Sequence, residues 1–190
     1  MKKFLSFAVI VLLSFALSNT FGQGKNYLGI GANLALPLGT FGDVAGVGIG
    51  GTASFEMEFT PNITGIASAG YLSFGGKDFT SAYYDYSYGY SDIPIMAGIK
   101  YYFTPGVPFY GIGQIGFQIF NANYSSTVTV PGFYNLDVSG SGSSTEFAFS
   151  IGAGYEIPAG RNGAIDVTGT FNLISNLNYI GARVAYRFGI

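Results

Sequence analysis

Charged residues in this chain fall on alternate positions of short stretches whose other positions are apolar. Glu56 and Glu58 alternate with Phe55, Met57 and Phe59. Successive side chains of a β-strand point to opposite faces, so such a stretch has one apolar face and one charged face. The pattern therefore predicts strands that are apolar on one side, and a barrel built from them turns that side either into a soluble core or outward into lipid.

The first 22 residues have the pattern of a secretory signal peptide. Lys2 and Lys3 form a basic start, residues 4–17 are apolar apart from two serines, and small residues precede a cleavage site between Gly22 and Gln23. This run is shorter than the roughly 20 residues that a spanning helix needs, so we expect a cleaved signal rather than an anchor. Residues 23–190 then form one mature domain, in which no apolar run is long enough to span as a helix.

The composition of the chain favours a membrane location and excludes several chemistries. A soluble domain has about 25% charged residues, whereas this chain has 9%. Without Lys2 and Lys3, six basic and ten acidic residues remain, and the resulting net charge of −4 argues against nucleic acid as a partner. The chain has no Cys and no His. We therefore expect no disulfide, no metal, no cofactor and no catalytic residue.

Alternation of apolar and polar residues predicts eight strands in the mature chain. The polar positions are rich in Gly, which suits a narrow interior. The facing of the third strand is ambiguous, because neither of its faces is clearly polar. The predicted strands are 26–37, 46–59, 63–74, 91–103, 108–120, 145–157, 164–173 and 178–188.

The predicted connections alternate between short and long along most of the chain. Short turns rich in Pro, Gly and Asn are expected at 60–62, 104–106 and 158–163, and longer connections at 75–90 and 121–144. A further longer connection covers 38–45, and the last connection, 174–177, is short. Short periplasmic turns and longer external loops are typical of outer-membrane barrels, whose strands need only about 9–11 residues to cross.

The chain resembles the porin-like family of small outer-membrane β-barrels that includes OmpX and the OmpA transmembrane domain. The resemblance covers the mature chain and is carried by the signal peptide, by 93–95 (Ile-Pro-Ile) and 100–103 (Lys-Tyr-Tyr-Phe) at the two ends of the fourth strand, and by 184–188 (Val-Ala-Tyr-Arg-Phe) near the end of the last strand. It implies an all-β, eight-stranded antiparallel up-and-down transmembrane β-barrel in the outer membrane of a Gram-negative bacterium. It also implies contact with outer-membrane lipids, and with the barrel-assembly machinery, which reads the near-terminal aromatic strand.

Membrane physics agrees with this resemblance. Spanning strands must close into a barrel because lipid cannot satisfy their backbone groups, and eight strands enclose an interior just wide enough for side chains to fill. Aromatic residues near the predicted periplasmic strand ends are expected to form an interfacial girdle. They are Tyr101, Tyr102, Phe103, Phe109, Tyr110, Tyr155, Tyr186 and Phe188.

Charged residues on the inward parity are the candidate site. Buried charges are tolerated when they are paired, so four carboxylates and three cations near one end predict a plug, with a selectivity or proton-transfer site as the alternative. Within this set we expect a group of Glu156, Asp166 and Arg187, with Arg183 one inward step higher. The whole set is Glu56, Glu58, Lys100, Glu156, Asp166, Arg183 and Arg187.

Two predicted external loops are candidates for an extracellular partner. Loop 75–90 is rich in Tyr, which gives rigid contact area for docking or extends the outer interfacial belt. Loop 121–144 contains a run of Ser and Gly at 139–144 and is expected to be flexible. The tyrosines concerned are Tyr83, Tyr84, Tyr86, Tyr88 and Tyr90.

Three functions are compatible with these features. The first is a non-catalytic, structural or surface-interacting outer-membrane barrel with a plugged lumen. The second is a narrow passive pore for ions or small solutes. The third is a secreted soluble barrel that binds a lipid, which would need apolar residues inside. Catalysis is disfavoured because enzymes of this scaffold generally use a His as acid or base, although Lys100 or a Glu could in principle act as a base.

Overall fold

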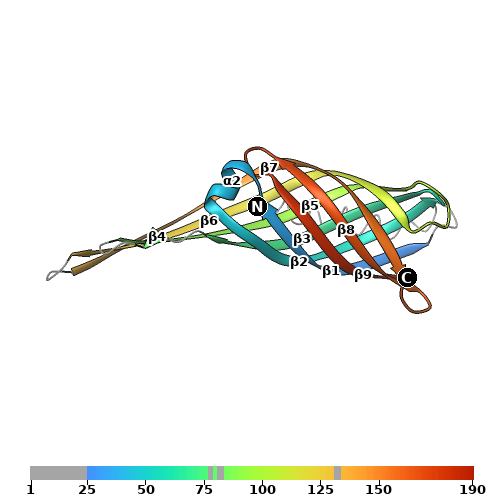
Figure 1. The fold of residues 1–190 in the computed structure, drawn as a ribbon, viewed down its shortest axis with the longest axis horizontal. Helices are drawn as coiled ribbons and strands as arrows, with labels where there is room; N and C mark the ends of the chain where they lie inside the picture. The colour runs from blue at the N-terminus through green and yellow to red at the C-terminus, as the bar shows by residue number, and fades with distance from the viewer. Residues whose placement is uncertain (1–24, 77–78, 81–83, 131–133) are drawn as a thin grey trace, which may run out of the picture.

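Eight long antiparallel strands close into a barrel, which confirms the predicted fold class (Figure 1). The computed structural model describes residues 25–190 except 77–78, 81–83 and 131–133, so the predicted signal peptide lies outside the described residues. The elements are β1 (Asn26–Pro37), α2 (Gly39–Val44), β2 (Ala45–Thr60), β3 (Ile63–Gly76), β4 (Phe79–Thr80), β5 (Tyr84–Tyr102), β6 (Phe109–Val130), β7 (Tyr134–Pro158), β8 (Gly163–Ile174) and β9 (Tyr179–Gly189).

The sheet closes because its first and last long strands pair. Successive strands are hydrogen-bonded neighbours, β1 pairs with β9, and β3 pairs with β5, while the two-residue β4 lies beside β5. The barrel wall is therefore continuous, which is what a backbone surrounded by lipid requires. No helix among the described residues is long and apolar enough to cross a membrane.

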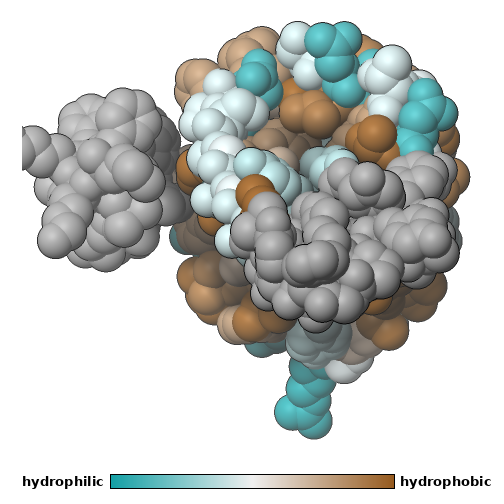
Figure 2. Space-filling model, turned by 90° about the vertical axis from the view of Figure 1, so that its left-hand side faces the viewer, coloured by the Kyte–Doolittle hydropathy of each residue, from teal (hydrophilic) through white to brown (hydrophobic). Residues whose placement is uncertain are grey.

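The apolar faces of the strands point outward. Ile30, Ile49 and Phe147 are 67%, 64% and 60% exposed. Inside the barrel, most of the buried side chains at the centre and at one end are polar or charged. Figure 2 shows hydrophobic residues around the outer wall of the barrel, seen from the end where the long hairpins project. This arrangement suits a lipid surround and contradicts the soluble lipid-binding barrel, which needs its apolar faces inside.

The third strand, whose facing the sequence left ambiguous, points its even-numbered residues inward. Thr64, Ile66, Leu72 and Phe74 are buried, while Tyr71 is 52% exposed on the outer wall. Three of these inward residues are apolar. The ambiguity therefore has a physical cause: part of the lumen of this barrel is filled by apolar rather than polar side chains.

Two of the predicted long loops are largely strand. Residues 121–130 continue β6 and 134–144 begin β7, with Ser125 opposite Ser139 in a regular ladder. The Ser and Gly residues of this segment predicted a flexible loop, but pairing with a neighbouring strand already fixed by the barrel satisfies their backbone groups. The resulting ribbon projects beyond the barrel wall (Figure 1).

The tyrosine-rich segment also belongs mainly to a strand rather than to a loop. The backbones of Tyr84, Tyr86, Tyr88 and Tyr90 lie in β5 and pair with β6. Tyr83 lies outside the described residues. The Tyr residues fit the strand because aromatic side chains favour the pleated surface, and here this preference outweighs the loop signal from neighbouring polar residues.

The connection between β1 and β2 packs into one end of the lumen. Its short helix α2 lies where the projecting hairpins leave the barrel (Figure 1) and places Phe41, 2% exposed, among inward side chains of the strands. The Phe41 ring packs edge-on against the rings of Phe74, Tyr90 and Phe120, with centroids 5.1, 6.0 and 5.9 Å away. We call the buried apolar cluster around Phe41 the apolar plug; its members are Ala35, Phe41, Ala45, Leu72, Phe74, Met96, Phe120, Ala148, Ile174 and Tyr179.

Candidate functional site

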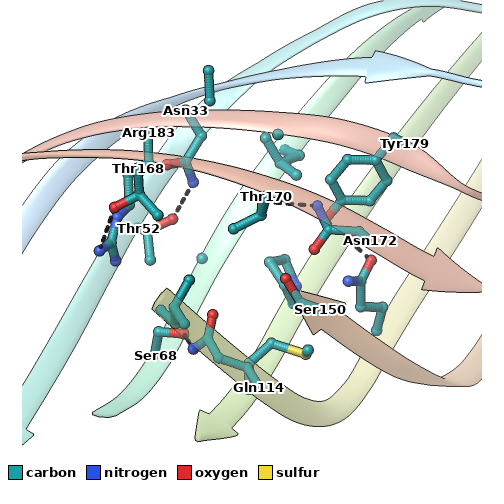
Figure 3. A pocket seen from close by; sticks show the side chains of 18 of the residues that line it. Asn33, Thr52, Ser68, Gln114, Ser150, Thr168, Thr170, Asn172, Tyr179 and Arg183 are labelled. Carbon is teal, nitrogen blue, oxygen red and sulfur yellow. Dashed lines mark hydrogen bonds between the residues drawn. The ribbon is translucent and has the colours of Figure 1, made fainter. Parts of the chain in front are cut away.

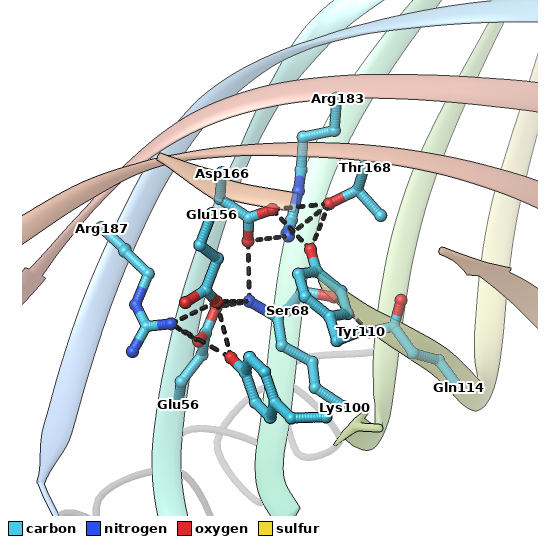
Figure 4. A network of polar contacts seen from close by, with 11 residues as sticks. Glu56, Ser68, Lys100, Tyr110, Gln114, Glu156, Asp166, Thr168, Arg183 and Arg187 are labelled. Carbon is cyan, nitrogen blue, oxygen red and sulfur yellow. Dashed lines mark hydrogen bonds and ion pairs between the residues drawn. The ribbon is translucent and has the colours of Figure 1, made fainter. Parts of the chain in front are cut away.

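A network of ion pairs occupies the lumen at the end of the barrel opposite the apolar plug (Figure 4). Its side chains come from five strands, because each lies on the inward parity of its strand near a short turn. Glu156 on β7 lies directly opposite Asp166 on β8 in the ladder, as the sequence predicted. We call this cluster the charge network; its members are Glu56, Lys100, Glu156, Asp166, Arg183 and Arg187.

Lys100 is the centre of the charge network. Its ammonium nitrogen lies 2.8 Å from Glu56, 2.7 Å from Asp166 and 3.2 Å from Glu156, and the side chain is fully buried. The same nitrogen lies 4.6 Å from the centroid of the Tyr110 ring, which adds a cation–π contact. One cation thereby satisfies carboxylates from three separate strands and ties opposite walls of the barrel together.

Two arginines complete the charge balance. Arg183 lies 3.0 Å from Asp166, and Arg187 contacts Glu156 directly and lies 3.7 Å from Glu56. The three carboxylates and three cations of the network neutralise each other. A buried ion pair costs desolvation and is tolerable only when its geometry and hydrogen bonds are good, so a closed, neutral set is the stable arrangement.

Hydroxyl groups supply the hydrogen bonds that the charges still need. Tyr102 donates to Glu156 at 2.7 Å, while Tyr110 and Thr168 donate to Asp166 at 2.5 and 2.8 Å. Assignment of Tyr102 and Tyr110 to the interfacial girdle was therefore wrong, because both point into the lumen. The alternation pattern could have predicted the inward position of Tyr102, because Tyr102 is two residues from Lys100 and therefore on the same face of the strand.

The other predicted girdle residues lie on the outward face near the short turns. Five of them are exposed: Tyr101, Phe103, Phe109, Tyr155 and Tyr186. Phe188, also on the outward parity, is partly buried. Three ring pairs form within this set, between Tyr101 and Phe103, Phe103 and Phe109, and Tyr186 and Phe188. Their position matches that of an aromatic belt at a membrane interface.

The structure corrects two details of the predicted cluster. Asp166 lies opposite Ala185, two residues from both Arg183 and Arg187, and its ion-pair partner is Arg183, while Arg187 pairs with Glu156 and Glu56. The β8–β9 register is centred on the predicted connection 174–177, so the register itself agrees with the prediction. Glu58 is on the inward parity but takes part in none of the ion pairs of the described residues. It lies at the mouth of the barrel, where water can solvate it.

A small polar chamber separates the charge network from the apolar plug (Figure 3). Its volume is about 80 Å³, enough for several waters. The side chains that line it include Asn33, Gln114, Gln118, Asn172 and Arg183. The Nε2 atom of Gln118 and the Nε atom of Arg183 are buried without a hydrogen-bond partner, which favours water in this chamber.

Asp92 is an inward carboxylate that the sequence pattern had not singled out. It lies in β5, eight residues before Lys100 and on the same parity, which is the signal that identifies it. Its side chain is fully buried, and it belongs to no ion pair of the described residues. It lies at the level of the apolar plug, because its partners across the ladder are Leu72 and Phe120.

Comparison with known proteins supports the fold. No protein family model matches the chain, and no curated protein matches it. The crystal structure of Ail, the attachment invasion locus protein of Yersinia pestis, has a TM-score of 0.57 and 19% identity and covers 88% of this chain and all of that chain. A major outer membrane protein from Thermus thermophilus has a TM-score of 0.52 and 11% identity, over 87% of this chain and 99% of that one. The chain therefore has the fold of small outer-membrane β-barrels, the group that its sequence pattern resembles.

Proposed function

We propose that this protein is an integral, non-catalytic barrel of the outer membrane of a Gram-negative bacterium, inserted after cleavage of the signal peptide near Gly22 and Gln23. The barrel would anchor a surface-exposed β-ribbon in the membrane, with a lumen closed by side chains. The observation that carries this proposal is the outward apolar face of all eight strands combined with an ionised, paired interior. Only a lipid surround makes that arrangement favourable.

Two independent seals support the closed lumen. The charge network fills the end with the short turns, and the apolar plug fills the end with the projecting hairpins. The chamber between them is only about 80 Å³. In planar lipid bilayers the refolded protein should therefore give no sustained single-channel current. Steady channels of uniform conductance would instead support the narrow pore, the second candidate, which the polar lining of the chamber favours.

The ribbon formed by β5, β6 and β7 is the proposed interaction surface. β7 pairs with β8 only from Ala148 onward, so at 138–147 it pairs with β6 alone among the described strands. Edge strands are usually protected by Lys, Pro or a bulge, and 138–147 contains neither Lys nor Pro. An extended segment of a partner can add to such an edge through main-chain hydrogen bonds.

This surface role can be separated from the anchor role by shortening the ribbon. Asn123 lies opposite Ser141, so replacing 124–140 by a two-residue Asn-Gly turn removes the outer part of β6 and β7, including 138–140 of the β7 edge, without touching the barrel. The shortened protein should still migrate as a folded barrel on unheated SDS gels. A panel of fluorescent strand-forming peptides should bind the complete protein more strongly than the shortened one. Equal binding to both proteins would show that the ribbon is not the surface that binds the peptides.

Non-catalytic function is proposed from the chemistry of the charge network. Each of its carboxylates is held by a cation, and Lys100 is held by three carboxylates. A general base needs a free lone pair within reach of a substrate, and a largely buried set whose carboxylates are all paired with cations offers none. Hydrolysis of phospholipid or peptide substrates by the purified barrel, lost on changing Lys100 to Met, would contradict this part of the proposal.

A further inference from the structure

Asp92 is a buried carboxyl group placed inside an apolar environment. Its side chain is fully buried, and neither oxygen makes a hydrogen bond of normal geometry, the backbone N–H of Ile93 being the nearby donor. Its cross-strand partners Leu72 and Phe120 both belong to the apolar plug. Directly opposite residues of an antiparallel pair point to the same side, so Asp92 is packed between two apolar side chains.

No cation of the described residues neutralises Asp92. Lys100 lies eight residues further along the same strand, about 26 Å away at the usual rise per residue, and both it and the two arginines are engaged in the charge network. The titratable groups that face Asp92 are tyrosines, which cannot supply a positive charge. Tyr179 on β9 is within electrostatic reach of it, and Tyr90 packs on the same cluster.

The other described residues around Asp92 add no positive charge either. On β7, Glu146 lies opposite Gln118, which is one inward step from Phe120, and it is partly exposed. α2 contributes the apolar Phe41, while its acidic Asp43 is exposed. The inward plug residues of β1, β2, β3 and β8 are apolar. An ionised carboxylate with no partner in such a place is strongly disfavoured, so the group either keeps a proton or draws in water.

We propose that Asp92 is a proton-binding site that makes the apolar plug sensitive to pH. With its proton, Asp92 is neutral and the plug packs around it. When the proton leaves, the carboxylate must be hydrated, and the rings around Phe41 would separate to admit water from the outer mouth of the barrel. The chamber lies directly below the plug and shares Leu72, Met96 and Tyr179 with it. Loss of one proton would therefore connect the outer mouth of the barrel with a polar space that is otherwise closed.

Infrared difference spectroscopy tests the proton itself on the complete, refolded barrel. A carboxylic-acid C=O band should be present at neutral pH and disappear as the pH is raised. The band should be missing in Asp92→Asn and unchanged in Glu146→Gln, the matched control for a neighbouring inward carboxyl group that is partly exposed. Absence of the band from the unmodified protein at neutral pH would overturn the proposal, whatever the behaviour of the variants.

A cysteine reporter tests the opening of the plug, since the chain has no Cys of its own. Ala148 is fully buried in the plug, so Ala148→Cys should react slowly with a charged thiol reagent at neutral pH. Its rate, divided by that of the exposed Ser141→Cys to remove the effect of thiol ionisation, should rise by about tenfold or more at alkaline pH, as expected for a local opening.

The reporter result must depend on Asp92. In an Ala148→Cys, Asp92→Asn double variant that still migrates as a folded barrel, the normalised rate should stay flat with pH. A flat rate in the Ala148→Cys protein that keeps Asp92 would show that the proton does not control the plug. A rise that persists in the double variant would assign the opening to another group, and either result would refute the switch.

Discussion

The ammonium nitrogen of Lys100 lies 2.7 Å from a carboxylate oxygen of Asp166, although the two residues are 66 positions apart in the chain. β5 and β8 are not neighbours in the sheet, since β6 and β7 lie between them. The contact therefore crosses the lumen. An ion pair of this kind links opposite walls of the barrel and places charged side chains inside the lumen.

Replacing Lys100 with Met should destabilise the barrel by about 3–5 kcal/mol, because three buried carboxylates lose their common cation. Water entering the lumen would lower this figure. Unfolding of the refolded barrel in urea measures it. Arg161→Met is the control: Arg161 is exposed in a short turn, so its loss should stay within about 0.5 kcal/mol. Equal effects of the two substitutions would mean that the network adds nothing to stability.

Arg187 should be energetically coupled to Glu156 and not to Glu58. The Arg187→Met and Glu156→Gln substitutions should deviate from additivity by more than about 0.5 kcal/mol in a double-mutant cycle, because their side chains are in contact. Glu58→Gln provides the matched control, since Glu58 belongs to none of the ion pairs of the described residues. Additivity in both cycles would place Arg187 outside the network.

The outer face of β7 should not tolerate charge. Ile151 is 53% exposed and lies in the middle of the membrane-facing part of the strand, so Ile151→Arg should cost about 2–4 kcal/mol in a bilayer. Ser141→Arg, on the projecting ribbon, should cost far less. The adjacent Gly152 is no useful control, because an added Cβ would clash with the carbonyl oxygen of Gly169. A small loss at Ile151 would argue against lipid exposure.

Phe41 should contribute to both the stability and the closure of the lumen. Phe41→Ala removes a fully packed ring and should cost about 3–5 kcal/mol. Because the charge network still blocks the other end, this substitution alone should leave the bilayer electrically silent. Combining it with Lys100→Met removes both seals and should produce channel openings. Openings in the Phe41→Ala protein by itself would show that the network is not a barrier.

Proteolysis of intact cells should report the orientation of the barrel. A protease added outside should cut within 75–90 or 121–144 and spare the turns at 60–62, 104–106 and 158–163, because the projecting hairpins are expected to face the exterior. The test is mass spectrometry of the released peptides. Cuts confined to the short turns would invert the proposed topology.

Alternation along the chain was enough to predict eight strands and, for most of those whose two faces differ clearly, the side that faces outward; it did not assign the facing of the third strand or of 108–120. Side chains alternate between the two faces of a strand, so once a charged residue such as Lys100 or Arg187 is placed inside, every second residue of that strand is placed inside as well. The same rule brought Glu56, Glu156 and Asp166 to one face of the sheet without any knowledge of the pairing. It failed on β3 because Ile66, Leu72 and Phe74 fill the lumen with apolar atoms.

Which charges meet, and how the lumen is closed, depends on the folded barrel. Arg183 and Arg187 are each two residues from Ala185, which lies opposite Asp166, yet Asp166 pairs with Arg183; strand parity and register do not decide between the two arginines. Phe41 enters the lumen from a helix of six residues, a position that no periodic pattern in the sequence predicts. Ser and Gly at 139–144 form a strand because β6 is there to pair with them. These features depend on contacts between distant segments, so only the closed barrel defines them.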